Sequence, residues 1–124
     1  MYEITIEDRF SSAHQLRDYE GKCENLHGHN WIVKVSIRGN SLDDKGMLID
    51  FKVLKKILNK ILEELDHKFL NEVPPFDKLN PTAENIANYI YFKVEESLNS
   101  PELEVSRVKI WESENSYAVF SKDT

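Results

Sequence analysis

Three of the four histidines in this chain fall where two predicted strands would bring them together at one end of a sheet. Alternating apolar residues predict one extended segment from Tyr2 to His14. A second begins with His27 and His29 and continues into Trp31. Because strand side chains repeat every two residues, all three imidazoles share the apolar face, and a hairpin would make them converge. Three imidazole nitrogens with a fourth position left open form the arrangement of catalytic zinc, so we predict a zinc metalloenzyme.

Cys23 lies four residues before His27, within reach of the same site. Spacing alone leaves two interpretations of this thiol open. It can be the fourth ligand of a closed structural zinc site. It can also be a thiolate that acts as a base or nucleophile beside an open zinc site.

Two further places carry groups that can move protons or bind a ligand. Asp66 and His67 follow the last apolar position of a predicted helix, and a carboxylate beside an imidazole is a common acid–base pair. An ordinary charged turn explains the same dipeptide equally well.

Glu112 shares a predicted strand face with Val108 and Ile110, so its carboxylate should point inward and needs a partner there. A guanine-type or pterin ring would supply suitable donors, and so would a lysine or arginine.

The composition predicts a single globular domain over residues 1–124. A net charge of -6 argues against nucleic-acid and anionic-membrane partners, but it permits an anionic small molecule in a local pocket. Cys23 is the only cysteine, so no internal disulfide forms and a reducing cytoplasm is expected. The charged residues 1–9 predict no signal peptide, and no stretch is long and apolar enough for a membrane span.

Periodicity along the chain predicts the order strand, strand, helix, helix, strand, strand. Asp50 is the predicted N-cap of the first helix, and Asn80-Pro81-Thr82 precedes the second, which ends before Pro101. This order predicts an α+β fold with a four-stranded antiparallel sheet and two helices on one face. The exposed edges of such a sheet need cover, so we expect the chain to associate with further copies.

Side-chain directions in the third predicted strand follow from the same alternation. Ser106 falls on the apolar face that leads to Glu112, whereas Val105 falls on the opposite face together with Arg107. The last strand is predicted over residues 117–120, after a tight connection.

These motifs together resemble the family of 6-pyruvoyltetrahydropterin synthase and 6-carboxytetrahydropterin synthase. The matching stretches run in family order over nearly the whole chain: Phe10-Ser-Ser-Ala-His14, Cys23-Glu-Asn-Leu-His27-Gly-His29-Asn30, Asp50-Phe51, Leu65-Asp66-His67, Asn80-Pro81-Thr82-Ala-Glu84-Asn85 and Trp111-Glu112. The resemblance implies the tunnelling fold (T-fold), in which ββααββ subunits join their sheet edges into an oligomeric barrel. It also implies homotrimers that stack as homohexamers, with active sites at subunit interfaces.

Carried over residue by residue, the resemblance makes His14, His27 and His29 the zinc ligands. It makes Cys23 the catalytic base beside them. A proton relay is implied to reach in from a neighbouring subunit, formed by Asp66 and His67. The pterin ring is implied to lie in a pocket that includes Glu112, Thr82 and Glu84.

The implied activity is that of a zinc-dependent lyase acting on 7,8-dihydroneopterin triphosphate. A cysteine, three residues and then His-Gly-His, as at Cys23 to His29, resembles the bacterial and archaeal members that form 6-carboxy-5,6,7,8-tetrahydropterin for the 7-deazaguanine (queuosine) pathway. The animal pyruvoyl-forming enzymes have a longer gap. Glu24 is a departure, because a glutamate here resembles a subgroup that forms 6-hydroxymethyldihydropterin for folate synthesis, and it is a further candidate catalytic residue. A non-enzymatic alternative is a structural zinc or pterin-binding module in which Cys23 closes the zinc site.

Overall fold

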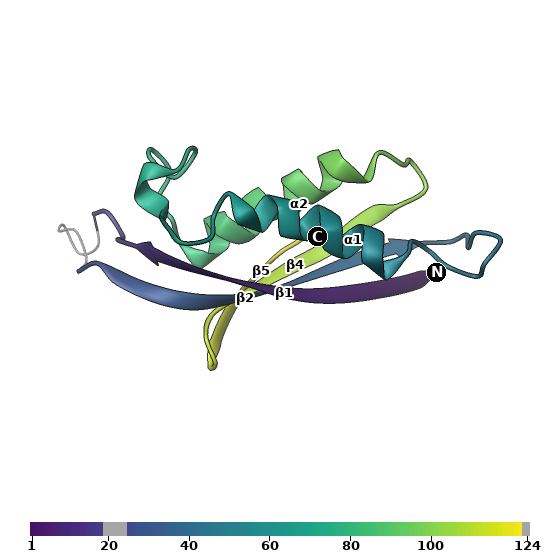
Figure 1. Ribbon diagram of the computed structural model, residues 1–124, viewed down its shortest axis with the longest axis horizontal. Helices are drawn as coiled ribbons and strands as arrows, with labels where there is room; N and C mark the ends of the chain where they lie inside the picture. Colours follow the sequence, from purple (N-terminus) through teal and green to yellow (C-terminus); the bar gives the residue numbers. More distant parts are fainter. Residues whose placement is uncertain (19–24, 123–124) are drawn as a thin grey trace.

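Two helices cover one face of a single β-sheet, and the other face of the sheet carries no helix among the described residues (Figure 1). The computed structural model describes residues 1–18 and 25–122. In chain order the elements are β1 (Tyr2–His14), β2 (His27–Gly39), α1 (Phe51–Glu63), β3 (Lys68–Phe69), the 3₁₀ turn η1 (Leu70–Glu72), α2 (Ala83–Leu98), β4 (Glu104–Ser113) and β5 (Ser116–Phe120). The predicted α+β class and the helices on one face are confirmed.

The sheet has five strands, in the order β3-β1-β2-β4-β5, instead of the four predicted. The additional strand, β3, is two residues long and pairs in parallel with Ser12 and Ala13 of β1. The other neighbouring strands are antiparallel, so the sheet is mixed. The sequence did not predict β3 because two residues show no alternation that could mark a strand.

β1 and β2 form a long antiparallel hairpin with the predicted alternation of buried and exposed side chains. Ser12 lies opposite His29 in the register. His14 lies opposite His27, at the end where β1 leaves the sheet and β2 enters it. The predicted meeting of the three histidines on one face is therefore confirmed.

The first helix begins at the predicted N-cap, and the second begins within the predicted start signal, at Thr82. The Asp50 carboxylate accepts the Lys52 N–H at 2.8 Å. The Thr82 hydroxyl accepts the Asn85 N–H at 3.1 Å. The apolar faces of the helices pack on the sheet through Leu54, Leu58, Ile61 and Leu62 of α1 and through Ile86, Ala87, Ile90, Tyr91 and Val94 of α2. Neither helix in the described part of the chain combines the length and the apolar composition that crossing a membrane requires.

A β-bulge in β4 overturns two predicted side-chain directions. The register pairs Ile37 with Val105 and then Ser36 with Arg107, so Ser106 is an extra residue on β4. Val105 therefore turns into the core, where it is 1% exposed, and not onto the outer face. Ser106 is buried too, but it lies on the side of Glu3 and not on the predicted apolar face, because its hydroxyl donates to the Glu3 carboxylate at 2.9 Å and lies 3.0 Å from the Ser36 carbonyl oxygen. The alternation could not reveal the bulge, because one inserted residue shifts the pattern without an obvious signal.

Both edges of the sheet remain largely open among the described residues. β3 covers β1 only at Ser12 and Ala13, so residues 2–9 have a neighbouring strand on one side only. β5 is the other edge and pairs with β4 alone. Unpaired strand edges are surfaces on which another chain can add.

Candidate metal centre and catalytic site

The three predicted zinc ligands meet at one end of the β1–β2 hairpin. One ligand nitrogen from each of His14, His27 and His29 lies within 4.8 Å of the others. The ring centroids are 4.9 or 5.0 Å apart. The imidazoles therefore surround one point, as a tetrahedral metal with three protein ligands requires.

His14 is held in the tautomer that a metal ligand needs. Its Nδ1 lies 2.8 Å from the Pro81 carbonyl oxygen, which can only accept, so Nδ1 carries the proton. Its Nε2 then carries the lone pair, and this atom is buried with no hydrogen-bond partner among the described residues. A buried polar atom of this kind is costly unless something binds it. The cluster thus fits a metal ion, with Pro81 orienting one of its ligands from behind.

An apolar floor lies under the histidines. Trp31 is fully buried, and its ring stands edge-on to His14 at 5.1 Å and to His29 at 5.2 Å between centroids. Phe10 stacks on Trp31 at 5.9 Å. Aromatic packing therefore limits the access of water to the cluster on this side.

Glu112 reaches the same cluster from β4. Its carboxylate oxygens lie 3.8 Å from Nε2 of His14 and 3.7 Å from Nε2 of His29. These distances are too long for hydrogen bonds, but they place a negative charge beside the point where the ring nitrogens converge. The Glu112 side chain is 37% exposed, so it remains accessible to the N–H donors of a ligand held at the cluster.

Asp66 and His67 follow α1 and dock on β1 at Ser11. The Asp66 carboxylate accepts the Ser11 N–H at 2.8 Å, and the His67 N–H donates to the Ser11 carbonyl at 2.6 Å. The hydrogen bond from Ser11 holds the pKa of Asp66 below its usual value, more strongly than burial raises it, and the His67 ring adds to the lowering. The other Asp66 oxygen lies 3.0 Å from Nδ1 of His67, so the carboxylate orients the imidazole.

The His67 ring projects from the surface of its own chain. The side chain is 82% exposed, on a residue with a left-handed φ of 55°. Asp66 is its side-chain partner within the described chain. His67 borders a surface depression that Gly28, His29 and Asn30 also line. The structure therefore joins Asp66 to His67 and leaves the imidazole exposed beside the hairpin that carries the three histidines.

Thr82 and Glu84 lie where the chain enters α2. Thr82 caps the helix and comes directly after Pro81, the residue that binds His14. Glu84 is exposed in the first turn. Cys23 and Glu24, the predicted base and the further candidate catalytic residue, lie outside the described residues.

Sequence reasoning missed two residues that shape the cluster. Pro81 acts through its backbone carbonyl, so its side chain carries no signal of this contact, and the sequence indicated only a helix start there. Trp31 did carry a signal, because it shares strand parity with His29 and lies one step further into the core.

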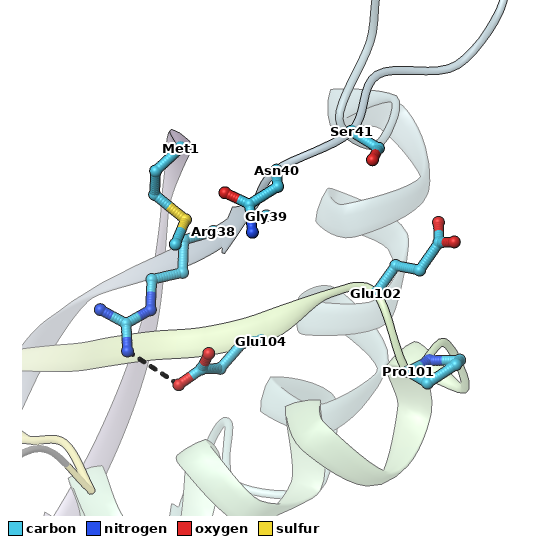
Figure 2. Close-up of a pocket in the computed structure, with 8 residues that line it drawn as sticks. All are labelled: Met1, Arg38, Gly39, Asn40, Ser41, Pro101, Glu102 and Glu104. Carbon is cyan, nitrogen blue, oxygen red and sulfur yellow. Dashed lines mark hydrogen bonds and ion pairs between the residues drawn. The ribbon is translucent and has the colours of Figure 1, made fainter.

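A second surface pocket lies at the opposite end of β2 (Figure 2). Its lining consists of Met1, Arg38, Gly39, Asn40, Ser41, Pro101, Glu102 and Glu104. Arg38 donates to Glu104 at 2.8 Å, so these charges are paired within the chain. No histidine or cysteine is among these eight residues, so this pocket lacks the side chains that make the histidine cluster a candidate metal site.

Fold and site together define an α+β domain with a three-histidine candidate metal centre at the end of its longest hairpin. The sequence profile of the family described as 6-pyruvoyl tetrahydropterin synthase matches residues 3–123. The chain belongs to this family, and the predicted resemblance is confirmed. It is accordingly an enzyme of the lyase type with the pterin synthase activity of the family.

Three similar proteins carry three different names. A 6-carboxy-5,6,7,8-tetrahydropterin synthase of Haemophilus influenzae is 34% identical, over 98% of this chain and 100% of its own. A dihydroneopterin monophosphate aldolase of Pyrococcus furiosus is 35% identical, over 83% of this chain and 82% of its own. The solved structure of Caenorhabditis elegans 6-pyruvoyl tetrahydropterin synthase superposes with a TM-score of 0.83 at 31% identity, covering 99% and 98% of the two chains. The fold is thus that of the solved family members, whereas similarity alone does not choose among the three activities.

Proposed function

We propose that this chain is a zinc-dependent enzyme that converts 7,8-dihydroneopterin triphosphate to 6-carboxy-5,6,7,8-tetrahydropterin, in the 7-deazaguanine (queuosine) pathway. The observation that carries the proposal is the convergence of three histidine nitrogens, one of them buried and unbonded, beside the carboxylate of Glu112. The short spacing from Cys23 to the His-Gly-His sequence supports the carboxy product over the pyruvoyl product. The name of the Haemophilus influenzae relative agrees with this choice.

The residues of the chain divide the work. His14, His27 and His29 would hold the zinc ion, whose Lewis acidity toward the side-chain oxygens of the substrate would make the adjacent C–H easier to deprotonate. Cys23, as a thiolate, removes that proton. His67, held by Asp66 at 3.0 Å, returns a proton. Glu112 accepts N–H groups of the pterin ring, and Thr82 and Glu84 border the pterin pocket.

The exposed position of His67 supports a site shared between subunits. Within its own chain His67 is paired with Asp66 and is 82% exposed, and the edges at β1 and β5 are open for a second copy. We therefore place the relay of one subunit beside the zinc of the next, in a homotrimer or homohexamer.

Mixing two variants that each fail to form the carboxy product tests the shared site. Cys23→Ala chains and His67→Ala chains should regenerate part of this carboxytetrahydropterin synthesis once subunits exchange, because some interfaces then combine an intact cysteine with an intact relay. Light scattering of each variant should first give a trimer or hexamer. A mixture that still forms no carboxy product after labelled chains have been seen to exchange would place the whole site within one chain.

Product analysis with 7,8-dihydroneopterin triphosphate tests the choice of reaction. We expect 6-carboxytetrahydropterin as the main product through Cys23, with some 6-hydroxymethyldihydropterin through Glu24. Cys23→Ala should abolish the first product and spare the second, and Glu24→Ala should do the reverse. An unchanged product mixture from Glu24→Ala would exclude a catalytic role for this glutamate.

Zinc content separates the enzyme from a structural zinc or pterin-binding module. Cys23→Ala should retain close to one zinc per chain while it loses turnover to the carboxy product, because three histidines suffice for an open site. Loss of zinc from this variant would instead make Cys23 the fourth ligand of a closed site.

A further inference from the structure

Two asparagine side chains bind the strand that carries His14 just after it leaves the sheet. Asn71 accepts the Gln15 N–H at 2.9 Å and donates its amide N–H to the Gln15 carbonyl at 2.7 Å. Asn80 does the same at Arg17, accepting the N–H at 2.8 Å and donating to the carbonyl at 3.1 Å. Each side chain therefore makes a two-point contact with one backbone residue.

These contacts imitate a neighbouring β-strand. In an extended chain, residues two apart present their N–H and C=O groups to the same side, and Gln15 and Arg17 are such a pair. β3 pairs with β1 only as far as Ala13, so the asparagines continue the edge where the short strand stops. A primary amide carries both a donor and an acceptor on one flat group, which a carboxylate or a hydroxyl cannot reproduce at both points.

Arg17 closes the same loop from the other direction. Its Nη2 donates to the Phe76 carbonyl at 2.7 Å and to the Asn71 carbonyl at 3.3 Å, and its Nη1 lies 3.4 Å from the Leu79 carbonyl oxygen. The loop between β3 and α2 is thus bound to the exit of β1 through backbone and side chains of both segments.

Asn80 differs from Asn71 in its neighbour along the chain. The next residue, Pro81, presents the carbonyl that accepts Nδ1–H of His14 at 2.8 Å. The Asn80 carbonyl in turn accepts the Asn85 side chain at 2.8 Å, which fixes the peptide before Pro81 from the helix side. A shift of residue 80 therefore moves the acceptor that sets the tautomer of His14.

We propose that Asn80 is a positioning residue of the metal centre, holding the Pro81 carbonyl against His14, whereas Asn71 braces the same strand without this effect. The inference rests on the proposed zinc site. It adds a residue whose contribution to the site is indirect, through the orientation of one ligand.

The matched pair Asn80→Ala and Asn71→Ala tests the proposal, because each variant loses two hydrogen bonds to the same strand. Zn²⁺ affinity is measured on the full chain by competition with a chromophoric chelator, and the Co²⁺ form is examined by its visible absorption. Asn80→Ala should weaken Zn²⁺ binding about 10- to 100-fold and alter the Co²⁺ bands. Asn71→Ala should stay within about threefold of wild type and keep the bands, while both variants lose similar resistance to urea.

Equal losses of Zn²⁺ affinity in the two variants, or wild-type affinity in Asn80→Ala, would overturn the inference. If either alanine variant fails to fold, Asn80→Asp and Asn71→Asp replace the pair, since each keeps the acceptor and loses the donor. The order of Zn²⁺ affinities should be the same, and a reversed or absent difference would contradict the proposal. A wild-type chain that binds no Zn²⁺ would instead refute the proposed function, and this inference with it.

Discussion

The two ends of the β1–β2 hairpin place polar groups in opposite ways. Near the start of β1, Arg107 donates to both carboxylate oxygens of Glu3, at 2.8 and 3.0 Å, and thereby holds the pKa of Glu3 below its usual value. Arg38 and Glu104 pair beside it. At the other end, the buried Nε2 of His14 has no hydrogen-bond partner among the described residues. The charges of Glu3 and Arg107 satisfy each other, whereas a buried and unbonded nitrogen such as Nε2 of His14 indicates a missing ligand.

The largest effect should follow from changing the histidine end. His14→Ala removes the ligand that is most deeply buried, so the zinc content should fall to near zero and activity by more than about 100-fold. Elemental analysis and a turnover assay measure the two quantities. A variant that retains full zinc would show that the cluster is not the metal site, and the contrast between the two ends would lose its meaning.

Glu112→Gln should have the next largest effect, because it removes the negative charge beside the cluster and keeps the shape. Loss of a charged hydrogen bond predicts that pterin binding weakens by about 1.5–3 kcal/mol, or roughly 10- to 150-fold in dissociation constant. Titration with a pterin product measures this, with zinc content as the control. Weaker zinc binding with unchanged pterin affinity would make Glu112 a metal ligand and not a ring anchor.

Asp66→Asn, a substitution at the histidine end, should change how the free energy of unfolding of the chain depends on pH. Because the folded pKa of Asp66 is lowered, its charged form stabilises the fold above the unfolded-state pKa, and this contribution disappears as the pH falls through the folded-state pKa. Wild type should therefore exceed the variant in stability at neutral pH, and the two should converge as the pH falls below the folded-state pKa of Asp66. Urea unfolding across this range measures the gap. A gap of constant size would mean that the charge of Asp66 does not matter.

Arg107→Ala should have the smallest effect, at the paired end. An exposed ion pair contributes about 1 kcal/mol or less, even with two contacts to the same carboxylate. We expect a small shift of the urea midpoint, with unchanged zinc content and turnover. A loss of activity comparable with that of His14→Ala would contradict the assignment of a purely structural role to this end.

Regular patterns made the main features of fold and site predictable. Alternation through Phe10 and Ser12 predicted the direction of His14, because a regular pleat keeps its period to the end of the strand. Asp50 and Thr82 predicted helix starts because their side chains can bind the N–H groups that a helix leaves free. These patterns are local in sequence, so they can be read without knowledge of the tertiary contacts.

The features that could not be predicted depend on contacts between segments distant in sequence. β3 is defined by the pairing of residues 68 and 69 with β1, and the bulge at Ser106 by the register of β4 against β2. The Pro81 carbonyl and the Asn80 amide reach β1 across more than sixty residues of chain. Residue type alone does not distinguish Pro81 and Asn80 from other prolines and asparagines that make no such contact.

The packing of Trp31 against the histidines gives the protein an optical property. The chain has two tryptophans. Trp31 lies 5.1 Å from the ring of His14, while Trp111 stacks on Tyr117 at 4.5 Å. A paramagnetic ion such as Cu²⁺ bound by these histidines would quench the fluorescence of the Trp31 indole, on which the rings of His14 and His29 pack. In a Trp111→Phe variant, Trp31 would be the remaining tryptophan. Its emission would then report the fraction of chains with an occupied candidate metal centre, without any substrate.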